Sequence, residues 1–139
     1  MRLFRVTVML FIITALVVTT GATLVAAGDV SKAEKAEIQD AMKKYVTDHT
    51  AESGTLPVVY QGKVLVLTLH TSEKYPDGFH SSVVNEGELF ASCADFIDTR
   101  TNTKYDIDFL VNQVDGQYLV VQPIVHSIDG KKTPYDLSH

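Results

Sequence analysis

One stretch decides the fold of this chain: SKAEKAEIQDAMKKYVTDH, residues 31–49. Ser31 and Glu34 have the S-x-x-E spacing of a capping box, in which side chains satisfy the free amides of a first helical turn. Apolar or aromatic residues then recur every three or four positions, which places them on one face of a helix. They are Ile38, Ala41, Met42, Tyr45, Val46 and His49. The pattern predicts one amphipathic helix that buries this face.

Residues 58–128 have the pattern of antiparallel strands. Gln61-Gly62 separates two apolar runs and predicts a tight hairpin or a bulged strand, and Asp115-Gly116 is a strong hairpin signal. The nearly continuous apolar run 64–69 predicts a strand that is covered on both faces. The polar stretch Thr71 to Gly87 reads as the longest irregular connection. The expected strands are 58–60, 63–69, 88–98, 104–112 and 117–127, with a bend at Pro123 and a short edge strand after Asp129-Gly130.

The stretch KYDIDFLVN, residues 104–112, has a strict alternation. Successive side chains of a strand point to opposite faces, so Asp106 and Asp108 share one face, opposite an apolar face. The apolar stripe of the helix needs such a face to bury against. We therefore expect two sets of residues to pack together: Ile38, Met42, Tyr45 and Val46 of the helix, and Ile107, Phe109 and Val111 of the strand.

The order of one helix followed by several strands predicts an α+β fold in which one N-terminal helix packs on a curved antiparallel sheet of four to five strands. The helix-then-meander order over residues 31–128 resembles the cystatin-like fold. That resemblance implies the topology and not protease inhibition. Cystatin inhibitors carry Q-x-V-x-G in their first hairpin, where this chain has Tyr60-Gln61-Gly62-Lys63-Val64, and a Pro-Trp pair, whereas this chain has no tryptophan. The stretches 94–98, 105–109 and 125–130 also resemble those of small exported bacterial proteins of unknown function.

Residues 1–27 have the plan of a secretory signal peptide. Arg2 and Arg5 precede an uncharged apolar run, and Val25-Ala26-Ala27 supplies the small residues that a signal peptidase requires. Cleavage after Ala27 would leave residues 28–139 as a single α+β domain in the periplasm or outside the cell. The alternative is a retained anchor, because the uncharged stretch is long enough to span a bilayer at roughly 20 residues. Under both interpretations the domain faces outward, and it meets a membrane only if the leader is retained.

Composition restricts the partners. Without Arg2 and Arg5, the 17 acidic residues exceed the basic residues by seven. Such a surface repels phosphate backbones and anionic lipid, so nucleic acid is not an expected partner. An unknown protein or a small ligand is expected instead. A single cysteine cannot form an internal disulfide, and no cofactor motif is visible.

Four residues are the candidates for a binding site: Asp95, Asp106, Asp108 and His126. Carboxylates on an open sheet face suit a hard cation or a basic partner, and a histidine beside a carboxylate can be held in its charged form. A convergence of all four on one polar patch requires Asp95 to share the face of Asp106. The pattern around Asp95 leaves its face open, and the irregularity at Pro123 does the same for His126.

Cys93 lies in an apolar strand without a neighbouring base, so the expectation is a small core residue. None of the five histidines has a metal-ligand spacing in the sequence, so no metal site is assigned. We therefore expect a non-catalytic binding or interaction module. The alternatives are a binder of small ligands or divalent cations that uses the acidic sheet face, and an enzyme of unknown class.

Overall fold

The computed structural model describes residues 29–135, so the expected leader at residues 1–27 lies outside the described part. Helix α1 (Lys32–Thr50) begins after Ser31, whose Oγ accepts a hydrogen bond from the Glu34 amide at 3.2 Å. The helix therefore starts where the capping pattern predicts. Its buried residues are Ile38, Met42 and Val46, which lie on the expected apolar stripe. In residues 29–135, no helix has the length and apolar character that crossing a membrane requires.

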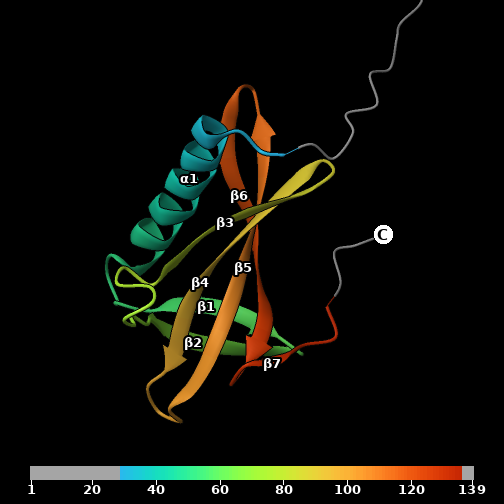
Figure 1. Ribbon diagram of the computed structural model, residues 1–139. Helices are drawn as coiled ribbons and strands as arrows, with labels where there is room; N and C mark the ends of the chain where they lie inside the picture. Colours follow the sequence, from blue (N-terminus) through green and yellow to red (C-terminus); the bar gives the residue numbers. More distant parts are fainter. Residues whose placement is uncertain (1–28, 136–139) are drawn as a thin grey trace, which may run out of the picture.

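In the described part of the chain, the helix packs on an antiparallel sheet of seven strands, which confirms the α+β class but exceeds the expected four to five strands. In the sheet β4 pairs with β5, β5 with β6 and β6 with β7 (Figure 1). The other edge of β4 is shared by β2 at one end and β3 along the rest. The strands are β1 (Leu56–Tyr60), β2 (Lys63–Leu69), β3 (Phe79–Glu86), β4 (Leu89–Asp98), β5 (Thr103–Val114), β6 (Gln117–Ile128) and β7 (Lys131–Lys132).

Strand β3 lies inside the stretch that we expected to be an irregular connection. It runs antiparallel to β4 from Phe79↔Ala94 to Glu86↔Leu89, with a register shift between Phe79 and Val83. A two-residue turn at Gly87-Glu88 joins the two strands, and Gly87 has a φ of 83° there. Five of the eight residues of β3 are polar, so a low apolar content did not exclude a strand.

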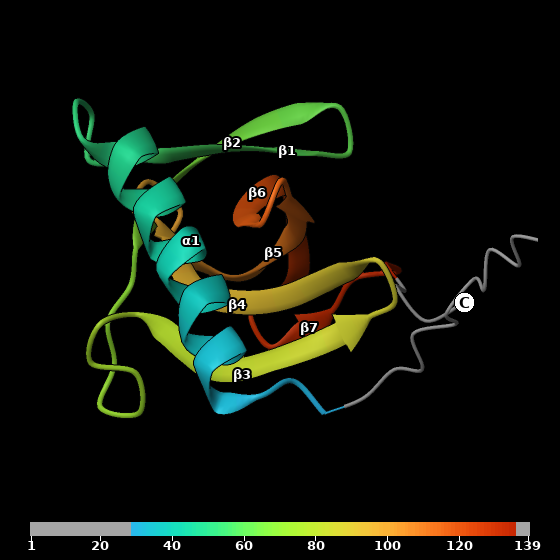
Figure 2. The ribbon, with the colours of Figure 1, turned by 90° about the horizontal axis from the view of Figure 1, so that it is seen from above.

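Strand β2 is also not covered on both faces as expected. Val64 and Val66 are exposed, whereas Leu67 is fully buried. The reason is that β2 meets β4 only at Thr68↔Ile97 and Leu69↔Phe96, while its remaining length pairs with β1 alone. Figure 2 shows the β1–β2 hairpin on one side of the fold and the β3–β4 pair on the other, with β5 and β6 between them.

The core lies between α1 and the sheet, with the packing that the two apolar patterns predict. Met42 and Val46 share one buried cluster with Ile107 and Phe109. Ile38 and Val111 belong to a second cluster. The Tyr45 ring packs edge-on against Phe109, with ring centroids 5.9 Å apart. The face of β5 that carries Asp106 and Asp108 is consequently turned away from the helix.

Candidate functional site

The outer face of the sheet brings four polar side chains of β4 and β5 together. Cys93 pairs with Asp108, and Asp95 pairs with Asp106. Cross-strand partners share a face, and the neighbouring pair Ala94↔Ile107 is fully buried on the helix side. Asp95 therefore lies on the face of Asp106, a point that the sequence left open.

A β-bulge brings His126 to the same face. Asp106 pairs with Ser127 and Ile107 pairs with Val125, so His126 is the extra residue of β6. Bulges of this kind change the direction of a side chain. The Nδ1 atom of His126 lies 2.7 Å from Oδ2 of Asp108. The irregularities of β6 fall on either side of Pro123, which itself pairs with Phe109, so the bend expected at Pro123 is displaced.

Asp108 links His126 to the C-terminal segment. A carboxylate only accepts hydrogen bonds, so His126 Nδ1 donates to Asp108 Oδ2, as does the Tyr135 hydroxyl at 3.2 Å. Burial, followed by the Asp108 carboxylate, raises the pKa of Tyr135. Asp108 is itself buried, and these two donors stabilise its charge.

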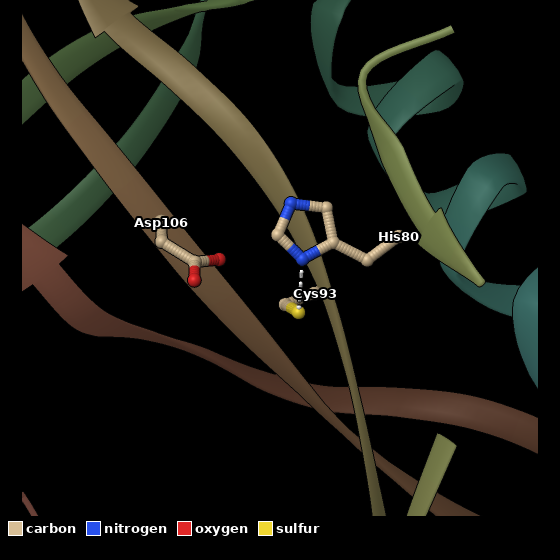
Figure 3. Close-up of side chains that lie close together, drawn as sticks. All are labelled: His80, Cys93 and Asp106. Carbon is tan, nitrogen blue, oxygen red and sulfur yellow. Dashed lines mark hydrogen bonds between the residues drawn. The ribbon is translucent and has the colours of Figure 1, made fainter. Parts of the chain in front are cut away.

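His80 of β3 is the central residue of a second group that the sequence analysis missed. Its Nδ1 lies 2.8 Å from Cys93 Sγ, and its Nε2 lies 3.0 Å from Asp95 Oδ1. Because the Asp95 carboxylate accepts, Nε2 carries the proton and Nδ1 accepts from the thiol. Figure 3 shows His80 reaching from β3, and Asp106 from β5, toward Cys93 on the strand between them.

Several contacts fix the position of His80. Its ring stacks on Tyr75 with centroids 3.8 Å apart, and its carbonyl accepts from the Gln39 side chain. Gly78, two residues earlier, has a φ of +81°, and a Cβ there would lie 3.0 Å from the His70 carbonyl oxygen. The Gly78 carbonyl also accepts from the Asp95 amide. The loop therefore fixes the backbone of His80, and Asp95 fixes the orientation of its imidazole ring.

Two signals in the sequence were available for this strand. Phe79 and Val83 have the parity of one strand face, and both contribute to the core. Glu86-Gly87-Glu88-Leu89 has a glycine where a two-residue hairpin turn requires a positive φ. Together they indicate a strand that ends at Glu86 and contains His80.

Asp106 completes a group of three possible metal ligands. One ligand atom from each of His80, Cys93 and Asp106 lies within 4.8 Å of the others. The Oδ1 atom of Asp106 is buried without a hydrogen-bond partner. Burial raises the pKa of Asp106; Asp108 and Asp95 add to this shift, whereas His80 and His126 oppose it. A buried carboxylate oxygen that lacks a partner is unfavourable unless a proton or a cation compensates it.

Cys93 is not the core residue that we expected. It lies on the outer face, partly exposed, against His80. Burial raises the pKa of its thiol, and the carboxylates of Asp106, Asp108 and Asp95 raise it further. The thiol is therefore protonated at neutral pH and can donate to His80.

Two cavities open beside this group. The cavity on the Cys93 side, about 320 Å³ in volume, is lined by Val84, Ala91, Cys93, Asp108, His126 and Tyr135 among others; we name it the Cys93 cavity. A second cavity of about 250 Å³ is lined by Asp95 and Asp106. The metal-ligand group thus lies where the two cavities approach each other.

Over residues 29–135, fold and site together define an α+β domain with one helix that carries thiol, imidazole and carboxylate groups on the open side of its sheet. No family model, no curated protein and no solved structure matches this chain.

Proposed function

We propose that this protein is a binding module for a divalent transition-metal ion, with zinc as the best fit, and that His80, Cys93 and Asp106 are the ligands. The observation that carries the proposal is the buried, unpartnered Asp106 Oδ1 in a group with His80 and Cys93. Imidazole nitrogen, thiolate sulfur and carboxylate oxygen are the donors that zinc takes in proteins. This specifies the divalent-cation alternative of the sequence analysis and replaces the hard cation with a softer one, because a thiol and an imidazole are among the donors.

The Cys93–His80 pair requires little adjustment to bind zinc. Around tetrahedral zinc, a sulfur at about 2.3 Å and a nitrogen at about 2.0 Å lie about 3.5 Å apart. The Cys93 Sγ to His80 Nδ1 distance is 2.8 Å, so the two atoms must separate by roughly 0.7 Å. A small side-chain rotation is enough for such a change. The lone pair of His80 Nδ1 already points toward Cys93 Sγ.

Charge supports the same proposal. Three carboxylates surround Cys93, and each raises the pKa of its thiol. A divalent ion reverses this effect, because a coordinated thiol loses its proton and a carboxylate ligand stays ionised. The ion would therefore compensate the negative charges that this face concentrates.

Asp95 has the role of a supporting residue. Histidines that bind metal usually donate their other ring N–H to a carboxylate, which fixes the tautomer and orients the ring. His80 makes this bond to Asp95 at 3.0 Å. Asp95 was a candidate from the sequence, and here it acts through His80 and not as a ligand.

Zinc titration of the chelator-treated protein by calorimetry tests the proposal. We expect one zinc per chain, release of protons on binding, and at least a hundredfold weaker affinity in Cys93→Ser and Asp106→Asn. Asp95→Asn should weaken binding about 10- to 100-fold, the range found for outer-shell partners. Asp48→Asn is the matched control, because Asp48 pairs with Lys44 on the exposed face of α1. Equal zinc affinity in the wild type and Cys93→Ser would refute the proposal.

A second candidate function rests on the order Cys93–His80–Asp95. A thiol beside an imidazole that a carboxylate orients is the arrangement of a cysteine nucleophile. The raised pKa of the Cys93 thiol weighs against it, because the thiolate is the nucleophile. In an enzyme of this kind, the Cys93 thiol would be alkylated rapidly in the absence of metal. A slow alkylation rate would favour the metal module instead.

The proposed setting is the periplasm or the exterior of the cell. The pattern of residues 1–27 supports export, and the acidic excess supports a small ligand or a protein partner over nucleic acid. We also propose a likeness to the cystatin-like fold, which is limited to the order of the elements: one helix followed by antiparallel strands. N-terminal sequencing of the exported protein should find Gly28 first, whereas an intact chain in detergent extracts of membranes would favour the anchor.

A further inference from the structure

We propose that the metal centre is open, and that its fourth ligand is a small neutral nitrogen or oxygen donor that enters through the Cys93 cavity. This inference rests on the proposed metal site and adds the class of ligand that the site takes.

The number of protein ligands is the first argument. Zinc in structural sites has four protein ligands, whereas an open site has three and leaves one position for water or a substrate. Within residues 29–135, the metal-ligand group has three members. Asp95 and Asp108 share this face but are not members of the group. Each already holds a histidine, because Asp95 Oδ1 accepts from His80, and Asp108 Oδ2 accepts from His126 and Tyr135.

The position of the Cys93 cavity is the second argument. Cys93 belongs both to the metal-ligand group and to the lining of this cavity. The cavity volume of about 320 Å³ is several times the roughly 30 Å³ that one water molecule occupies in the liquid. A ligand with a handful of heavy atoms can therefore reach the ion beside the sulfur.

Charge selects the class of ligand. A divalent ion bound by one thiolate, one carboxylate and a neutral imidazole forms a centre with no net charge. The cavity adds the carboxylates of Glu86 and Asp108 and one ammonium group, that of Lys132, and His126 donates its Nδ1 proton to Asp108. An anion would bring a further negative charge into this surrounding, so a neutral donor is favoured. The neutral form of His126, with its proton on Nδ1, can accept a hydrogen bond at Nε2 from such a ligand.

Cobalt substitution allows both parts to be tested on the full domain. Thiolate-to-cobalt charge transfer in the near ultraviolet reports binding at Cys93, and the visible bands of cobalt report its coordination. We expect imidazole to shift the visible bands while the charge-transfer band persists. Azide should need at least a tenfold higher concentration than imidazole for a comparable shift.

The route of entry is tested by filling the Cys93 cavity from its rim. Val84 lines the cavity and is 50% exposed on β3, so Val84→Trp narrows the space with little effect on the core. We expect this variant to bind cobalt as the wild type does and to bind imidazole at least tenfold more weakly. Val64→Trp is the control, because Val64 is 62% exposed on β2 and does not line this cavity.

The outcomes separate this inference from the proposed function. Cobalt binding with a charge-transfer band but no response to imidazole would overturn the open centre and leave the metal module intact. Azide binding as tightly as imidazole would overturn the neutral class, and unchanged imidazole binding in Val84→Trp would overturn the route. Failure to bind cobalt or zinc at all would overturn both proposals.

Discussion

Cys93 has surroundings that suppress its reactivity in the metal-free protein. Its thiol is partly buried and lies among the carboxylates of Asp95, Asp106 and Asp108, all of which raise its pKa. The partner that could activate it, His80, is neutral when it accepts from the thiol. The same thiol becomes a good ligand once a cation is present, because metal binding replaces the proton.

The first prediction concerns this thiol. Alkylation of Cys93 by iodoacetamide at pH 7.5 should be at least tenfold slower in the metal-free protein than in a free cysteine peptide, because little thiolate is present. Asp106→Asn should accelerate the reaction, since one of the negative charges is lost. The gain should be partial, because burial is the largest cause of the raised pKa. Measured alkylation rates check both statements, and alkylation as fast as in the peptide would favour the nucleophile.

Asp98 provides a second prediction, on acid stability. Its carboxylate accepts from the Arg100 guanidinium and the Arg100 amide at the turn after β4, and these bonds lower its pKa. A folded-state pKa below the unfolded value of about 3.9 contributes stability above that pH. The contribution is lost as the pH falls through the lower, folded-state pKa. Urea melts should therefore show Asp98→Asn to be less stable than the wild type at pH 7, with the difference shrinking below about pH 4.

The sequence predicted those parts of the site whose signals are local. Alternation along β5 placed Asp106 and Asp108 on one face, because a strand period needs only neighbouring residues. The strand of Asp95 has apolar residues on both faces, so the face of Asp95 could be assigned only from the register of β4 with β5. His126 depended on a bulge. The register and the bulge are long-range properties, and no local pattern contains them. His80 is different, because the parity of Phe79 and Val83 and the turn at Gly87 are local signals of its strand that the polar composition of residues 71–87 outweighed.

At the scale of elements, the loop before β3 determines where His80 lies. Gly78 combines a positive φ with a close approach to the His70 carbonyl. The sequence predicted that Gly78 lies in a long irregular connection over residues 71–87. This prediction is correct for the residues before Phe79 and wrong for β3. The helix, the hairpin turns and the strands β4 to β6 were predictable because their caps, turn glycines and periods are local.

Gly78→Ala is the prediction at this scale. The added Cβ meets backbone at 3.0 Å and the residue keeps a φ of +81°, so the loop must shift. We expect a loss of more than about 1 kcal/mol in unfolding free energy and weaker zinc binding, because His80 moves with the loop. Gly54→Ala is the control: Gly54 has a similar φ of +70° with nothing within 4 Å of a Cβ. It should lose stability through φ strain alone and keep the zinc affinity of the wild type, as melts and titrations can measure.

The helix and the sheet are joined by the core that both apolar patterns predicted. Ile38 and Phe109 are fully buried and come from α1 and β5. Ile38→Ala and Phe109→Ala should each reduce the unfolding free energy by roughly 2–5 kcal/mol, since large-to-small changes in a core leave a cavity. Val59→Ala is a suitable control, because Val59 is 71% exposed. Thermal melts without loss for both core variants would contradict this packing.

At the scale of the whole molecule, the proposed metal ligands join three adjacent strands. His80 comes from β3, Cys93 from β4 and Asp106 from β5, so the ion would tie the edge strand β3 to the centre of the sheet. Among the described residues, strand β3 pairs with another strand along one edge alone, and its register with β4 is irregular. Metal binding should therefore stabilise the region where the fold is least regular.

The last prediction follows from this coupling. An ion that binds the folded state alone stabilises it by about 2.7 kcal/mol at a hundred times its Kd. For a domain of this size, such a gain raises Tm by roughly 10 °C. Calorimetric melts should show this rise with zinc in the wild type and its loss in Cys93→Ser, whereas Asp48→Asn should respond as the wild type does. Hydrogen exchange should place the added protection in β3, whose amides we expect to exchange faster in the metal-free protein than those of β5, which is paired along both edges. Protection spread evenly over α1 and all the strands would indicate that zinc acts on global stability without holding β3 in particular.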